Sequence, residues 1–250
     1  MKQQIDLNAD LGEGASGENE LLGLVSSASI ACGFHAGDPA TMSATILAAQ
    51  AGGVAVGAHP SLDDRKNFGR TELPVSPKEV FALVAYQVGA FHAIAHSLGV
   101  EPQHVKPHGA LYNMAARDRA LADAVAHAVL AVSAQLILFA PGDSALAQAG
   151  EAIKLQVARE VFADRNYQPD GSLVARTESN ALLHDAEEAA ARVLRMLRDG
   201  VVCAVDGSDT ALQADTVCIH GDTPDAIVFA QKLRAGLASA GIAVLSPSRS

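Results

Sequence analysis

Short apolar segments alternate with longer amphipathic segments along the whole chain, and this pattern predicts a repeated strand–helix unit. The segment IDLNAD alternates apolar and polar residues, as a strand with one packed face does. Expected strands cover residues 4–10, 28–32, 54–58, 104–108, 135–140, 154–164, 201–205, 216–220 and 242–246. Expected helices cover residues 39–50, 76–98, 118–132, 184–199 and 223–240.

Helix starts are marked by capping residues. Asp38 stands directly before Pro39, and Ser76 stands before Pro77 with Glu79 three positions after the serine. A capping side chain followed by proline is typical of a helix N-terminus, and the Ser76–Glu79 spacing is that of a capping box. These signals predict that helices begin at Pro39 and Pro77.

Alternating strands and helices predict a parallel sheet covered by helices. Seven or eight such units favour closure into a distorted, TIM-like (β/α) barrel, with residues 1–250 as a single domain because no linker divides the chain. An open doubly wound sheet is the alternative. The segment LGEGASGE resembles a dinucleotide loop only in being rich in glycine, and no GxGxxG or GxxxxGK[ST] motif is present.

Composition excludes several classes of partner. The formal net charge is −10 and no stretch is rich in Lys or Arg, which argues against nucleic acid. The apolar runs are short and interrupted, so we expect no membrane span. The N-terminus lacks a secretory apolar core, and three widely spaced cysteines do not form a disulfide framework. We expect a cytoplasmic protein.

Ionisable residues follow the expected strands, often beside glycine or another turn-forming residue. They are Asp10, Glu13, His35, His59, Lys106, His108, Asp164, Arg165, His220 and Asp222. The carboxyl ends of barrel strands open on one face, where barrel enzymes place their active sites. We therefore expect these side chains to meet in one cleft. A lone histidine after a strand is more often structural, but histidines at four corresponding positions are harder to explain that way.

The remaining histidines carry weaker signals. His92 and His96 are four residues apart on an expected helix and could face a metal together, but the HExxH pattern is absent. We assign this pair, His104, His127 and His184 to surfaces or packing.

Two chemical designs fit the predicted cleft. In the first, Asp and His ligands hold a divalent metal that activates water, with Asp10, His35, His59 and His220 as candidate ligands. In the second, no metal binds, and His–Asp pairs act as acid and base while Lys106 and Arg165 stabilise negative charge. Spacing alone does not decide between them. A GxSxG nucleophile elbow is absent, which disfavours a serine hydrolase.

Eight motifs in a fixed order carry a family resemblance. They are IDLNADLGEG, SSASIACGFHAGDP, GVAVGAHPS, NFGR, YQVGAF, HVKPHGALYN, EVFADRNY and VCIHGD, between residues 5 and 222. With these motifs the chain resembles the LamB/YcsF family over nearly its whole length. The resemblance implies a distorted (β/α) barrel similar to that of polysaccharide deacetylases.

The resemblance also implies a function, as one component of a bacterial 5-oxoprolinase. The expected reaction is ATP-dependent opening of 5-oxo-L-proline to L-glutamate, with ADP and phosphate released, and with partner subunits B and C. Whether ATP binds this chain or a partner is left open. A stand-alone metal-dependent amidase or deacetylase and a non-catalytic scaffold are the alternatives. All ten ionisable residues named above lie within or directly beside the matching motifs.

Overall fold

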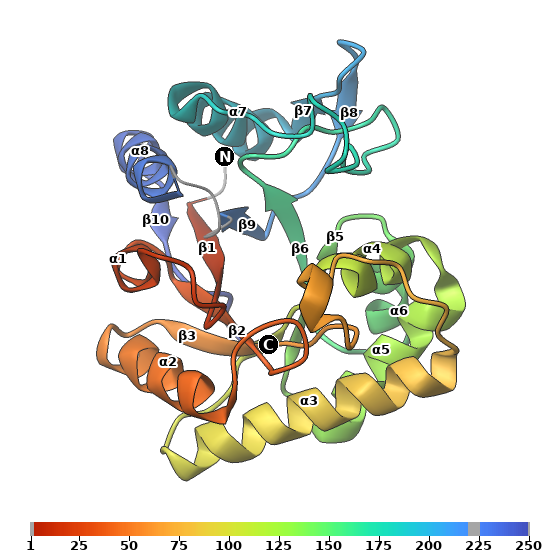
Figure 1. The fold of residues 1–250 in the computed structure, drawn as a ribbon. Helices are drawn as coiled ribbons and strands as arrows, with labels where there is room; N and C mark the ends of the chain where they lie inside the picture. The colour runs from red at the N-terminus through yellow and green to blue at the C-terminus, as the bar shows by residue number, and fades with distance from the viewer. Residues whose placement is uncertain (1–2, 220–225, 250) are drawn as a thin grey trace.

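A computed structural model describes residues 3–219 and 226–249. Its strands are β1 (Gln4–Leu11), β2 (Ser27–Ala31), β3 (Ala55–His59), β4 (His104–Val105), β5 (Ile137–Pro141), β6 (Val157–Phe162), β7 (Val201–Cys203), β8 (Asp209–Ala211), β9 (Thr216–Ile219) and β10 (Ala243–Val244). Its helices are α1 (Glu18–Leu22), α2 (Pro39–Ala51), α3 (Pro77–Ser97), α4 (Gly109–Arg117), α5 (Arg119–Val132), α6 (Ala145–Ala152), α7 (Ala186–Asp199) and α8 (Ala226–Ser239), with a 3₁₀ turn at Arg65–Asn67. The helices surround the strands (Figure 1).

The strands close into a parallel barrel. Within the described residues the order is β1-β2-β3-β4-β5-β6-β9, and β9 pairs with β1 to complete the ring of seven strands. Strand β10 extends the sheet by pairing with β1 beside Gln4 and Ile5. The expected barrel is thus confirmed, and the open doubly wound alternative is wrong. Closure places the carboxyl ends of all seven strands around one opening.

Alternation in β1 separates two environments. Ile5, Leu7, Ala9 and Leu11 belong to the apolar core that packs between sheet and helices. The alternate residues lie inside the barrel, where Asn8 Nδ2 donates to Glu160 Oε1 of β6 at 3.0 Å and to Thr216 Oγ1 of β9 at 2.7 Å. The polar positions of IDLNAD therefore form the barrel interior, and its apolar positions form the layer beneath the helices.

The amino-terminal half of the barrel interior is closed by packing and hydrogen bonds. Asp6 accepts hydrogen bonds from Ser27 Oγ at 2.7 Å and Thr216 Oγ1 at 2.5 Å, and burial raises the pKa of its carboxyl to about 6. His104 stacks on Phe139 with ring centroids 4.2 Å apart. These contacts fill the amino-terminal end of the barrel interior.

Most expected elements are present, with some differences. Helices α2, α3, α5 and α7 occupy the expected ranges. Asp38 Oδ1 caps α2 by accepting from Thr41 N, and Ser76 with Glu79 forms the expected capping box. The short helices α1, α4 and α6 are not predicted by the sequence pattern. Strand β4 covers only two residues of the expected 104–108.

The expected strand at 201–205 forms outside the barrel. Its residues Val201–Cys203 make β7, which pairs antiparallel with β8 in a separate hairpin. Its burial is also mixed, because only Val202 is buried and Cys203 is exposed. A short apolar run at this point predicts a strand but cannot indicate which sheet the strand joins.

The expectation that no apolar run is long enough to cross a membrane is wrong for α3. By length and composition alone, this helix is the one in the described part of the chain that could span a bilayer. Its buried side chains, Val80, Val84, Gln87, Val88, Phe91 and Ala95, face the protein, and the helix packs against α5 and β3. We interpret α3 as a helix that packs on the barrel.

Gly57 of β3 gives a direct test of the barrel packing. A Cβ atom at this position would lie 2.3 Å from the ring of His104, inside the filled interior. We expect Gly57→Ala to reduce the free energy of unfolding by about 1–3 kcal/mol, the usual cost of overpacking a core. Denaturant unfolding of the purified chain measures this change.

The matched control is Gly89→Ala in α3, where a Cβ atom meets nothing within 4 Å. Alanine has a higher helix propensity than glycine in a helix interior. The free energy of unfolding of this variant should therefore stay the same or rise by about 0.5–1 kcal/mol. If Gly57→Ala were as stable as Gly89→Ala, the packing of His104 against β3 described above would be incorrect.

Candidate active site

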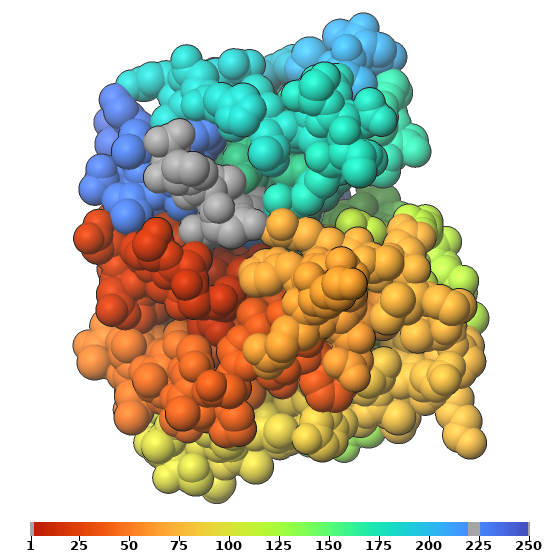
Figure 2. Space-filling model, in the orientation of Figure 1, coloured from red at the N-terminus to blue at the C-terminus, as the bar shows by residue number. Residues whose placement is uncertain are grey.

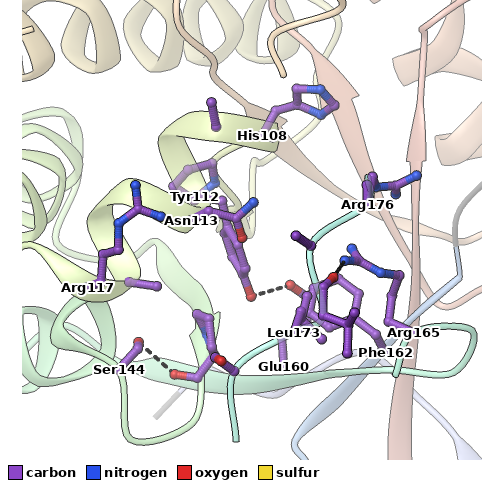
Figure 3. Close-up of a pocket in the computed structure, with 18 of the residues that line it drawn as sticks. His108, Tyr112, Asn113, Arg117, Ser144, Glu160, Phe162, Arg165, Leu173 and Arg176 are labelled. Atoms are coloured by element: carbon purple, nitrogen blue, oxygen red, sulfur yellow. Dashed lines mark hydrogen bonds between the residues drawn. The ribbon is translucent and has the colours of Figure 1, made fainter. Parts of the chain in front are cut away.

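A cavity of about 1060 Å³ lies where the barrel strands end. Its walls come from the segments that follow β1, β3, β4, β5 and β6, including part of α4. On the face shown in Figure 2, the loop after β3 lies next to the loop after β6. Figure 3 shows Tyr112 and Arg117 of α4 on one side of the cavity and Arg165 and Arg176 on the other.

Four side chains, one from the end of β3 and three from the segments that follow β1, β2 and β4, converge beside this cavity. Glu13, His35, His59 and His108 each offer a ligand atom, and these atoms lie within 4.8 Å of one another. Glu13 Oε1 lies 2.9 Å from His35 Nε2, 3.6 Å from His108 Nδ1 and 3.8 Å from His59 Nε2. We call this group the Glu–His tetrad.

Backbone carbonyls fix the orientation of two imidazoles in the tetrad. His59 Nδ1 lies 2.7 Å from the Lys106 carbonyl, and His108 Nε2 lies 2.8 Å from the Phe68 carbonyl. A carbonyl only accepts, so each of these nitrogens carries a proton. The other nitrogens, His59 Nε2 and His108 Nδ1, face each other at 2.9 Å. In two neutral rings these would be opposed lone pairs, so the contact requires a proton or a cation.

Buried charges decide where a proton would sit. Burial opposes protonation of His59, but the carboxylate of Asp10, 3.4 Å from Nε2, holds its pKa above the usual value. Burial lowers the pKa of His35 to about 3 and that of His108 well below its usual range. The tetrad therefore combines two neutral imidazoles with a place for one positive charge at His59.

Lys106 is a fixed cation behind the tetrad. Its Nζ lies 2.8 Å from Asp10 Oδ1 and 2.9 Å from Glu160 Oε1, and it donates to Asn8 Oδ1 at 2.9 Å. Burial alone would lower its pKa, but Asp10 and the other acceptors raise the pKa well above the ordinary lysine value. An ammonium has three N–H donors. Those of Lys106 already have three oxygen acceptors.

Glu160 is a buried acidic residue of the candidate site that the sequence analysis missed. It is 3% exposed, pairs with Lys106, and accepts from Tyr112 Oη at 2.6 Å (Figure 3). The available signal was an acidic residue in the middle of the strand segment VAREVF, where alternation places it on the same face as Ala158. A charge at such a position needs a buried partner.

The structure brings together most of the predicted site residues. Asp10, Glu13, His35, His59, Lys106 and His108 form the tetrad and the charges around it. Arg165 lines the cavity on the β6 side. Asp164 is buried next to Arg165 but is not among the lining residues. His220 and Asp222 lie outside the described residues.

The candidate metal ligands differ in part from the expected set. His35 and His59 belong to the tetrad, as expected. Glu13 and His108 complete it, whereas Asp10 contacts the tetrad through His59. The sequence could not separate Asp10 from Glu13, because both lie close to the end of the same strand, Asp10 inside β1 and Glu13 just after it.

Comparison with a family model covers nearly the whole chain. Residues 5–250 match the model of the LamB/YcsF family. This chain belongs to the LamB/YcsF family. A relative from Bordetella pertussis (strain Tohama I), named as the A subunit of 5-oxoprolinase, is 53% identical over 249 residues, which cover 98% of this chain and 99% of the relative.

Solved structures place this LamB/YcsF protein in a wider fold group. The lactam utilization protein from Thermus thermophilus superimposes with a TM-score of 0.91 at 42% identity, covering 98% of this chain and 100% of that chain. The catalytic domain of peptidoglycan N-acetylglucosamine deacetylase from Eubacterium rectale gives a TM-score of 0.53 at 11% identity, covering 99% of this chain and 90% of that chain. The second likeness shows the fold alone, and it confirms the expected similarity to polysaccharide deacetylases.

The donor set of the tetrad predicts metal binding. Imidazole nitrogens and one carboxylate are ligands that Zn²⁺ and related divalent ions accept, and the facing nitrogens of His59 and His108 suit a cation. We expect the purified chain to bind divalent zinc, and Glu13→Gln and His108→Ala to weaken binding by at least about tenfold. Calorimetric titration measures this affinity.

The control is the double variant His92→Ala, His96→Ala, which removes the i, i+4 histidine pair of α3. It should bind zinc as the unmodified chain does. If this control lost zinc binding while Glu13→Gln kept it, the metal would bind at the α3 histidine pair and not at the tetrad.

Proposed function

We propose that this chain is the A subunit of a 5-oxoprolinase. The enzyme hydrolyses 5-oxo-L-proline to L-glutamate with consumption of ATP, and the chain works with partner subunits B and C in the cytoplasm. The observation that carries the proposal is the buried Glu–His tetrad at the end of the barrel, with Asp10 and Lys106 behind it. The name of the Bordetella relative, which matches over almost the full length of both chains, supports it.

The reaction needs an activated lactam. Transfer of the terminal phosphoryl group of ATP to the amide oxygen forms an O–P bond and releases ADP, which leaves the ring carbon open to water. One water adds to that carbon, and the C–N bond breaks to give an amine and an acyl phosphate. A second water cleaves the acyl phosphate to L-glutamate and phosphate. Whichever subunit holds ATP, the water steps need a base, an acid and a stabilised oxyanion.

The chain's own residues fit these roles. In the design without a metal, the Asp10–His59 pair takes a proton from the attacking water and returns it to the ring nitrogen as the C–N bond breaks. Because the three donors of Lys106 already have oxygen acceptors, Lys106 positions Asp10 and Glu160 rather than contacting the substrate. In the alternative design, a divalent ion held by the tetrad would occupy His59 Nε2 and would polarise the water and the amide oxygen in place of this acid–base pair.

A second candidate function is a stand-alone metal-dependent amidase or deacetylase. The tetrad and the deacetylase-like fold favour it. It differs from the first in needing neither ATP nor partners, so release of product from a small amide by the purified metal-loaded chain is its test. A non-catalytic scaffold is the remaining alternative, but a scaffold gains nothing from burying this many ionisable groups.

Substitution in the three-subunit enzyme tests the proposed function. In a 5-oxoproline assay with ATP and subunits B and C, His108→Ala and Asp10→Asn should each lower kcat by roughly 10²–10³, because each removes a group that positions or stabilises charge. Ion pairing of Asp10 with Lys106 is also lost, so unfolding curves should accompany the assay.

The matched control for this assay is His127→Ala, which removes an imidazole that, among the described residues, bonds within α5 to the Asp123 carbonyl. This variant should turn over normally. Near-normal turnover of His108→Ala and Asp10→Asn would instead support the scaffold.

A further inference from the structure

Two arginines face the cavity on the side opposite to α4. Arg165 follows β6 and is 6% exposed, and Arg176 lies in the loop between β6 and α7. Both line the cavity, and both are drawn on the same wall in Figure 3. The other cavity arginines have visible partners: Arg117 pairs with Glu72, and Arg70 lies over the Phe68 ring.

Arg165 is buried with little compensation. Its Nη2 donates to the Val174 carbonyl at 2.5 Å, but its Nε has no hydrogen-bond partner among the described residues. Burial, and next the positive charge of Arg176, lower its pKa to about 10, although the charge of Asp164 acts in the opposite direction. A buried guanidinium beside a second one costs free energy unless an anion joins them. The two side chains therefore form a site suited to an anion.

The shape of the substrate indicates which anion fits there, if the proposed function holds. The ring carbon that reacts must lie at the Glu–His tetrad, and any phosphoryl group on the amide oxygen is attached to that same carbon. The carboxylate of 5-oxo-L-proline is attached to the ring carbon on the other side of the nitrogen. It projects away from the reacting carbon, so a lactam held with that carbon at the tetrad would present its carboxylate to another wall of the cavity.

We propose that Arg165 and Arg176 bind the carboxylate of 5-oxo-L-proline and so orient the lactam with its reacting carbon at the tetrad. A planar guanidinium matches a carboxylate with two parallel hydrogen bonds. Tyr112 and Phe162 line the cavity with aromatic surface suited to the ring itself. The arginine pair selects lactams that carry a carboxylate next to the nitrogen, and 2-pyrrolidinone lacks this group.

Calorimetry on the full chain with 5-oxo-L-proline tests this assignment. Because Arg176 is exposed, its replacement is compatible with folding. Arg176→Gln should weaken binding about tenfold to a hundredfold, the usual effect of losing a hydrogen bond to a charged group. Arg176→Lys keeps the charge but not the two parallel hydrogen bonds. Its affinity for 5-oxo-L-proline should lie between those of Arg176→Gln and the unmodified chain. Arg119→Gln, a surface arginine paired with Asp123, should bind as the unmodified chain does.

Each other outcome is informative. Equal binding by Arg176→Gln and the unmodified chain overturns the carboxylate site and leaves the proposed function standing. If Arg176→Gln loses affinity for inorganic phosphate while keeping that for 5-oxo-L-proline, the pair holds a phosphoryl group and the assignment is wrong. If the unmodified chain binds no 5-oxo-L-proline even in the complex with subunits B and C, the proposed function fails together with this inference.

Discussion

The arrangement of the site depends on one buried cation, the ammonium of Lys106. It lies between carboxylates of two different strands, Asp10 of β1 and Glu160 of β6, and itself follows β4. Removing one member would leave an uncompensated charge inside the barrel, which is strongly unfavourable. The three segments are therefore held in one register around the opening. The carboxylate of Asp10 in turn favours a positive charge at His59 Nε2, which either a proton or a bound metal ion can supply.

The two faces of the barrel strands have different roles, one in the stability of the fold and one in the chemistry of the site. Outward positions such as Leu7 and Ala9 pack beneath the helices and supply the hydrophobic stabilisation of the fold. Inward positions change along the barrel, from hydrogen-bonded Asp6 and stacked His104 at the floor to ionisable groups at the mouth. A rigid floor and a polar mouth are what a site needs when it must hold several charges in fixed positions.

Much of this could be predicted from the sequence because parallel strands impose a simple rule. Periodicity identifies the strands, and closure brings their ends together, so histidines 24 and 49 residues apart, His35, His59 and His108, could be grouped without coordinates. The rule does not say which way a side chain points. It could not separate Asp10 from Glu13 as a ligand, find Glu160 within its strand, or place β7 in a hairpin outside the barrel. Arg176 was missed because a loop residue gains its role only from the neighbour that the fold supplies.

The most direct test of the account is a crystal structure of the chain grown with zinc and L-glutamate, with anomalous scattering recorded at the zinc edge. The account predicts a zinc peak bonded to His59 Nε2 and His108 Nδ1, and glutamate in the same cavity with its α-carboxylate on the β6 side. Zinc and glutamate bound at separate places, with the tetrad nitrogens still in contact with each other, would contradict it.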